Sequence, residues 1–128
     1  MNQSQPEPDF GGMQVASFES RRADDIRRLI ERYQGQPHVS PSMREVALEE
    51  NRPSIDLANR IMIGEIDVFI VMTGVGFKHL IKAVEHHIDL DRFINCLRDM
   101  TTVTRGPKPV AAMKEFGITP TIKVPSPN

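Results

Sequence analysis

Residues 67–87 read DVFIVMTGVGFKHLIKAVEHH, and this stretch decides the fold. The apolar run Val68 to Met72 is rich in β-branched and aromatic residues, which predicts a strand buried on both faces of a parallel sheet. After Gly76 the apolar residues change to helical spacing, with charged residues on the opposite side. These apolar residues are Phe77, Leu80, Ile81, Val84 and Ile88. The stretch therefore predicts a strand that leads into a helix through a four-residue turn, Thr73-Gly74-Val75-Gly76.

This turn is a candidate anion site. Two glycines let the backbone turn sharply, and free amides at a helix N-terminus favour a carboxylate or a phosphate. The alternative is that the glycines only relieve steric crowding. A dinucleotide site is disfavoured because His79 stands where the third glycine of the fingerprint would be, and no Gly-Lys-Ser/Thr sequence indicates a nucleotide-triphosphate loop.

The rest of the chain repeats the pattern of strand and helix. We expect strands over residues 13–19, 101–104 and 121–124, and helices over residues 23–33, from Pro53 to about Gly64, after Asp89 or Asp91, and from Pro107 to Gly117. Residues 36–50 contain Pro37 and Pro41 and predict an extended edge segment or a connector. Residues 1–12 have the composition of a disordered tail.

Alternating strands and helices predict an α/β fold, a parallel sheet with flanking helices. Ligands of such folds bind at the carboxyl ends of the strands. Three turns meet there: Ser20-Arg21-Arg22, Thr73 to Gly76, and Arg105-Gly106. Arg21, Arg22 and Arg105 suit bidentate binding of carboxylates, and the alternative is that each is a solvated residue at a helix start.

Composition excludes several classes of function. The net charge is −1, from 16 basic and 17 acidic residues, so no global field favours nucleic acid or an anionic membrane. No apolar run has the length of a membrane span, and no signal peptide is visible, so we expect a cytoplasmic location. One cysteine, Cys96, excludes an internal disulfide, and the histidines do not form a metal set. We expect no metal and no cofactor.

Several stretches together resemble the uroporphyrinogen-III synthase family. They occur in the family's order, over residues 13–124, and correspond to its N-terminal half. The matching stretches are Val15-Ala16-Ser17-Phe18-Glu19-Ser20-Arg21-Arg22, Pro41-Ser42-Met43-Arg44-Glu45-Val46, Asp67 to Gly76, and Thr104-Arg105-Gly106-Pro107-Lys108-Pro109 with Ala111 to Gly117.

The resemblance implies two flavodoxin-like α/β lobes with a linear hydroxymethylbilane bound between them. The family closes this substrate to uroporphyrinogen III, with loss of water and inversion of the last pyrrole ring, in tetrapyrrole and haem biosynthesis. Residues 13–35 would then be the first strand and helix of lobe one, residues 36–50 the connector, and residues 51–128 a truncated second lobe.

By the same resemblance, Thr73, Gly74, Val75 and Gly76 would be the main substrate-binding turn, with Arg105 and Gly106 nearby. No catalytic residue is assigned, because the positioning of a reactive polycarboxylate substrate requires no side-chain nucleophile. The implied partners are the polycarboxylate substrate and either the missing C-terminal half or a second copy of the chain. The alternative function is a non-catalytic α/β module that binds small anions or a partner protein.

Overall fold

The computed structural model describes residues 8–18, 23–40 and 48–125. Strands and helices alternate as predicted, with two successive helices between the third and fourth strands. The elements are β1 (Gln14–Phe18), α1 (Ala23–Arg32), β2 (Gln36–Ser40), α2 (Leu48–Met62), β3 (Val68–Val71), α3 (Gly74–Val84), α4 (Leu90–Asp99), β4 (Thr101–Arg105), α5 (Pro107–Lys114) and β5 (Ile122–Val124).

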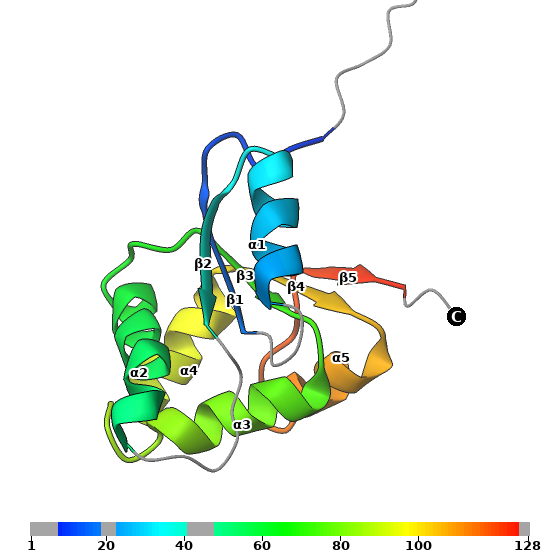
Figure 1. The fold of residues 1–128 in the computed structure, drawn as a ribbon. Coiled ribbons are helices and arrows are strands. Elements are labelled where there is room, and N and C mark those ends of the chain that lie inside the picture. Colours follow the sequence, from blue (N-terminus) through cyan, green and yellow to red (C-terminus); the bar gives the residue numbers. More distant parts are fainter. Residues whose placement is uncertain (1–7, 19–22, 41–47, 126–128) are drawn as a thin grey trace, which may run out of the picture.

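The five strands form one parallel sheet in the order β2-β1-β3-β4-β5. This confirms the predicted α/β class and the buried central position of β3. The order is that of a flavodoxin-like doubly wound sheet, in which the chain leaves β1 toward one side and then continues from β3 toward the other. Figure 1 shows α1 apart from the group formed by α2, α3, α4 and α5.

The expected division into two lobes does not hold within this chain. Residues of β1 pair in register with β3, Val15 with Val68 and Phe18 with Val71, so residues 13–35 and 51–128 contribute to the same sheet. The backbone amide of Gln14 also donates to the Asp67 carboxylate at 3.1 Å. The β1 strand pairs with β3. Without this pairing, one side of β3 would expose unpaired backbone N–H and C=O groups.

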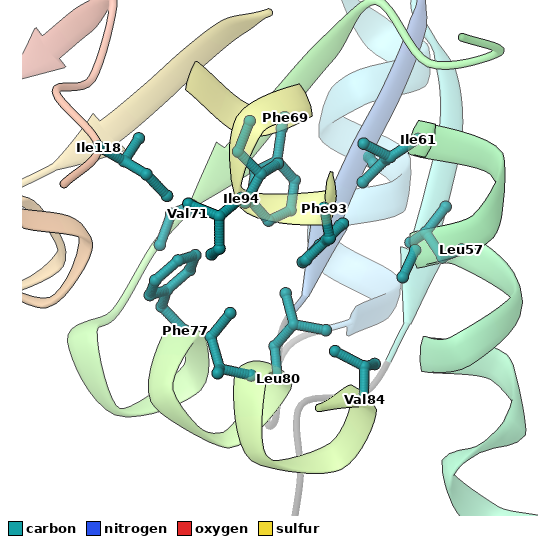
Figure 2. Packing of buried hydrophobic residues seen from close by; sticks show 14 of the residues in the cluster. Leu57, Ile61, Phe69, Val71, Phe77, Leu80, Val84, Phe93, Ile94 and Ile118 are labelled. Carbon is teal, nitrogen blue, oxygen red and sulfur yellow. The ribbon is translucent and has the colours of Figure 1, made fainter. Parts of the chain in front are cut away.

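The larger core lies between the sheet and the group of helices α2 to α5. Phe69 and Val71 of β3 face Phe77 and Leu80 of α3 (Figure 2). The phenyl rings of Phe77 and Phe116 meet edge to face, with their centroids 5.8 Å apart. Other members of this core are Leu57, Ile61, Val84, Phe93, Ile94, Leu97, Met113 and Ile118. The predicted apolar stripe of the helix after Gly76 is therefore the stripe that α3 buries.

A smaller core lies on the other face of the sheet, under α1. It contains Val15, Val68 and Ile30, and Phe10 packs against it. The amide of Phe10 donates to the carbonyl of Tyr33 at 2.7 Å. The expectation of a disordered tail over residues 1–12 is therefore wrong for residues 8–12, because an aromatic side chain there covers apolar sheet surface. Residues 1–7 lie outside the described ranges.

Residues 36–50 were predicted to form an extended edge segment or a connector. The structure describes a strand in the first part of this range and the start of a helix at its end. Residues 36–40 form β2 at one side of the sheet, where Pro37 is tolerated because an edge strand has a solvent-facing side. Residues 41–47, including Pro41, lie outside the described ranges. The helix predicted to start at Pro53 begins at Leu48, so Pro53 lies inside α2 and leaves one intrahelical hydrogen bond unmade.

Candidate functional site

The carboxyl ends of β1, β3 and β4 lie at one edge of the sheet, called here the carboxyl edge. In this strand order the crevice for a ligand is expected where the connections diverge, between β1 and β3. Phe18, the last residue of β1, pairs with Val71, the last residue of β3. The structure therefore brings the ends of these two strands together. Arg21 and Arg22, which follow β1 in the sequence, lie outside the described residues.

Thr73 is the N-cap of α3. Its backbone is extended, and its Oγ1 accepts a hydrogen bond of 2.9 Å from the amide of Gly76. The helix therefore begins at Gly74, and the expected four-residue turn is shorter than predicted, because a threonine hydroxyl satisfies an amide of the first helical turn. The Gly76 amide is therefore bonded inside the fold, and its role as a donor to a ligand stays a prediction.

Gly74 has a packing role. It is buried, and a Cβ added there would lie 2.8 Å from the carbonyl oxygen of Lys108 in α5. Only glycine permits this approach of the first turn of α3 to the start of α5. Lys78 of α3 and Glu115, just after α5, form an ion pair of 3.1 Å further along the same helix pair. The glycine thus sets the spacing of two helices at the carboxyl edge.

The turn after β4 has a similar internal organisation. Gly106 has φ +82°, a conformation that favours glycine, and its amide donates to the carbonyl of Val124 at 2.9 Å. This amide too is engaged within the fold. Pro107 is the first residue of α5, as predicted, because a missing N–H costs nothing there.

Exposed side chains at the carboxyl edge are the groups that a ligand can reach. Thr73 and Arg105 are exposed, and Val75 is 64% exposed. Lys108 is exposed as well and lies beside Gly74, a position that the sequence analysis did not single out. The sequence did contain a signal for Lys108, because this lysine lies in the segment Arg105-Gly106-Pro107-Lys108, which directly follows a predicted strand.

Two hydroxyl groups near this edge are buried without a hydrogen-bond partner, the side chains of Ser17 in β1 and Thr104 in β4. Each belongs to the next-to-last residue of its strand. Thr104 pairs in register with Val71, on the face that α3 and α5 cover, whereas Ser17 pairs with Ile70 on the α1 face. A buried hydroxyl group without a hydrogen-bond partner is uncommon in folded proteins. The Ser17 and Thr104 hydroxyl groups are therefore two donors and acceptors that the fold itself does not use.

A polar cluster outside the carboxyl edge centres on His38 in β2. Its Nε2 lies 2.6 Å from the side-chain oxygen of Gln14, and its Nδ1 lies 3.5 Å from a guanidinium nitrogen of Arg60. Burial lowers the pKa of His38, and Arg60 and Arg27 lower it further, against an opposing effect of Glu65. The neutral imidazole is therefore favoured, and sequence reasoning had assigned this histidine no role.

In the described ranges, no three side chains of histidine, cysteine, aspartate or glutamate gather as a metal ion would require. Among the helices in that part of the chain, none is long and apolar enough to span a bilayer.

Comparison with known proteins gives the family. A family described as uroporphyrinogen-III synthase HemD matches residues 24–128. The chain belongs to the uroporphyrinogen-III synthase family. The match begins at the second residue of α1, continues through β5 and leaves β1 outside its limits. A curated relative, the uncharacterized protein YjjA of Bacillus subtilis, is 32% identical over 109 residues, which are 85% of this chain and 40% of that protein.

A solved structure agrees with this family. A mutant uroporphyrinogen III synthase from the extremely thermophilic bacterium Thermus thermophilus is 26% identical, with a TM-score of 0.50, and the match covers 86% of this chain and 42% of that one. This confirms the predicted resemblance to the uroporphyrinogen-III synthase family. The chain thus spans about two-fifths of the length of each of these relatives.

Proposed function

We propose that this chain supplies the N-terminal part of a uroporphyrinogen-III synthase. In this role it helps to bind a linear tetrapyrrole polycarboxylate, hydroxymethylbilane, during closure to uroporphyrinogen III with loss of water. The observation that carries the proposal is the family match, which includes both described turns of the carboxyl edge. The activity would be that of a lyase of tetrapyrrole biosynthesis in the cytoplasm, and it would need no cofactor.

The proposed contacts are side chains rather than glycine amides. The amides of Gly76 and Gly106 are already bonded inside the fold, so they have no spare donor for a carboxylate. Arg105 and Lys108 are exposed cations near the starts of α3 and α5, where the helix dipoles also favour anions. The exposed side chains of Thr73 and Val75 would border the substrate, and Arg21 and Arg22 remain proposed contacts after β1.

The length of the chain bears on its activity. Because it spans about two-fifths of its solved relative, we expect it to bind substrate but to complete the cyclisation weakly or not at all by itself. The remainder would come from a C-terminal half or from a second copy. An assay that follows hydroxymethylbilane to the type III macrocycle tests this expectation. Full turnover by a monomer would contradict it.

The binding step is tested with uroporphyrin, a fluorescent polycarboxylate macrocycle. Val75→Glu places a negative charge at the exposed start of α3, where acids also suit the helix dipole, so the fold should survive. We expect uroporphyrin to bind about tenfold more weakly, since one repulsive charge at short range costs about 1.4 kcal/mol. Ile63→Glu is the matched control, because Ile63 is also 64% exposed but follows α2, at the opposite edge of the sheet.

A second candidate function is a non-catalytic α/β module that binds small anions or a partner protein. The exposed cations Arg105 and Lys108 near the starts of α3 and α5 favour it, because they would bind any small anion and do not require a tetrapyrrole. Equal uroporphyrin affinities of the wild type, Val75→Glu and Ile63→Glu would support this alternative and contradict the tetrapyrrole proposal.

A further inference from the structure

A polar groove lies along β2, the strand at one side of the sheet. Its volume is about 280 Å³, and its lining comes from β2, from α1 on one face of the sheet and from α2 on the other. Arg27 of α1 and Arg60 of α2 both line this groove, and so does His38 of β2. Three basic side chains from three separate elements therefore meet around one cavity.

The outer side of β2 is poorly suited to pair with another strand. Within the described residues, β2 has a neighbouring strand on one side only. Pro37 has no N–H group to donate, and Nη2 of Arg27 lies 3.5 Å from the carbonyl oxygen of Val39. Proline and charged side chains are the features by which edge strands avoid further pairing. The groove therefore suits a small ligand better than an extended peptide.

The two guanidinium groups have unused hydrogen-bond donors. Among the described residues, neither of them forms an ion pair with a carboxylate. The contact of Arg27 is the Val39 carbonyl, and the contact of Arg60 is the His38 imidazole, and each of these partners is a single acceptor. A guanidinium has five N–H donors, so most of them remain available to a ligand. Asp56 is the acid that lines the groove, against two arginines.

The hydrogen bonds of His38 assign its ring proton. Its Nε2 lies 2.6 Å from Oε1 of Gln14, and an amide oxygen can only accept, so Nε2 carries the proton. Nδ1 is then free to accept from Nη1 of Arg60, 3.5 Å away. Burial, Arg60 and Arg27 lower the pKa of His38, which agrees with a neutral ring. Protonation of Nδ1 would remove this acceptor and release Arg60 toward the groove.

We propose that the groove binds a small molecule that carries a phosphate or carboxylate group, with Arg27 and Arg60 as the binding residues. Planar guanidinium groups bind such oxyanions through paired hydrogen bonds. A protonated His38 would add a third positive charge, so anion binding and protonation should favour each other. The site lies along β2 and not at the starts of α3 and α5. The proposal therefore goes beyond the tetrapyrrole function and does not depend on it.

Titration of the full chain with inorganic phosphate and, separately, with acetate tests the site, with the NMR signals of the His38 ring as the readout. We expect saturable binding at neutral pH, and the anion that binds more tightly identifies the preferred group. Arg27→Gln and Arg60→Gln should each weaken binding about tenfold or more, because each removes a charge-assisted hydrogen bond. Arg28→Gln and Arg52→Gln are the matched controls. Each removes the same charge from the same helix at an exposed residue outside the lining, so the affinity should not change.

The pH dependence tests the part of His38. Sulfate is the probe, because it stays a dianion where histidine titrates. We expect its affinity to rise as the pH falls through the pKa of His38, and bound sulfate to raise that pKa. The other charged groups that face His38 are Arg27, Arg60, Asp56 and Glu65, and arginine and carboxylate side chains ordinarily titrate outside this range. His38→Gln should therefore remove the pH dependence and retain binding at neutral pH.

Three results would overturn the proposal. They are the absence of saturable binding of both phosphate and acetate, an equal loss of affinity in Arg27→Gln and Arg28→Gln, and a sulfate affinity that does not change with pH. The variants leave Val75 intact. Failure of this proposal is therefore distinguishable from failure of the tetrapyrrole function, which the uroporphyrin titration of Val75→Glu measures.

Discussion

Gly74→Ala tests whether this glycine serves helix packing. The added Cβ would lie 2.8 Å from the carbonyl oxygen of Lys108, and a backbone atom cannot rotate away as a side chain can. Overpacking of this kind costs about 1 to 3 kcal/mol. The gain in helix propensity on replacing glycine, about 1 kcal/mol in a helix interior, offsets part of it. We expect Gly74→Ala to lower the free energy of unfolding by about 1 to 2 kcal/mol.

The measurement is urea unfolding followed by circular dichroism. With an m-value of about 2 kcal/mol/M, the expected loss lowers the midpoint by roughly 0.5 to 1 M without changing m. Val75→Ala is the control in the same helical turn; its side chain is exposed, so the free energy of unfolding should change by less than about 0.5 kcal/mol. A Gly74→Ala protein that is as stable as the wild type would refute the packing argument. If such a protein also lost uroporphyrin binding, Gly74 would instead be part of the ligand site.

Two further predictions concern the Thr73 cap and His38. Thr73→Ala removes the acceptor of the Gly76 amide and should lower the free energy of unfolding by about 1 kcal/mol. Thr73→Ser keeps a hydroxyl group and should retain most of the stability. Equal losses of the two variants in urea unfolding would argue against a capping role. Because the folded-state pKa of His38 lies below its unfolded value, the unfolded chain binds more protons. This contribution to stability is therefore fully present above about pH 6.5 and is lost as the pH falls through the folded pKa. His38→Gln should reduce this pH dependence, and an unchanged slope would contradict the assignment.

Local patterns were enough to predict most of the elements. The apolar run of β3 and the helical spacing of α3 specify their own structures, and Asp89 caps α4 as expected. The start of α3 was misplaced because two glycines indicate a turn, whereas the hydroxyl of Thr73 extends the helix to Gly74. The start of α2 was misplaced because Pro53 suits a first helical position but lies inside the helix.

Long-range features were beyond the reach of the sequence pattern. The pairing of β1 with β3 joins segments about fifty residues apart, and nothing in either strand alone specifies its neighbour. The engagement of the Gly106 amide by Val124 likewise depends on β5, which follows later in the chain. The predicted ligand site at the carboxyl edge stays a prediction, and the pattern did not indicate that the Gly76 and Gly106 amides are bonded within the fold. Lys108 was not singled out either; its position after β4 was visible in the sequence, but its place beside α3 comes from the packing of the helices.

The interior place of β1 in the sheet has a consequence for synthesis on the ribosome. Of its two neighbours, β2 is translated soon after β1, but β3 is translated only after α2. Until then the nascent β1 has an unpaired side and an uncovered apolar face, and such non-local pairing is slow. The early part of the chain should therefore depend on chaperone protection until Val71 has emerged from the exit tunnel.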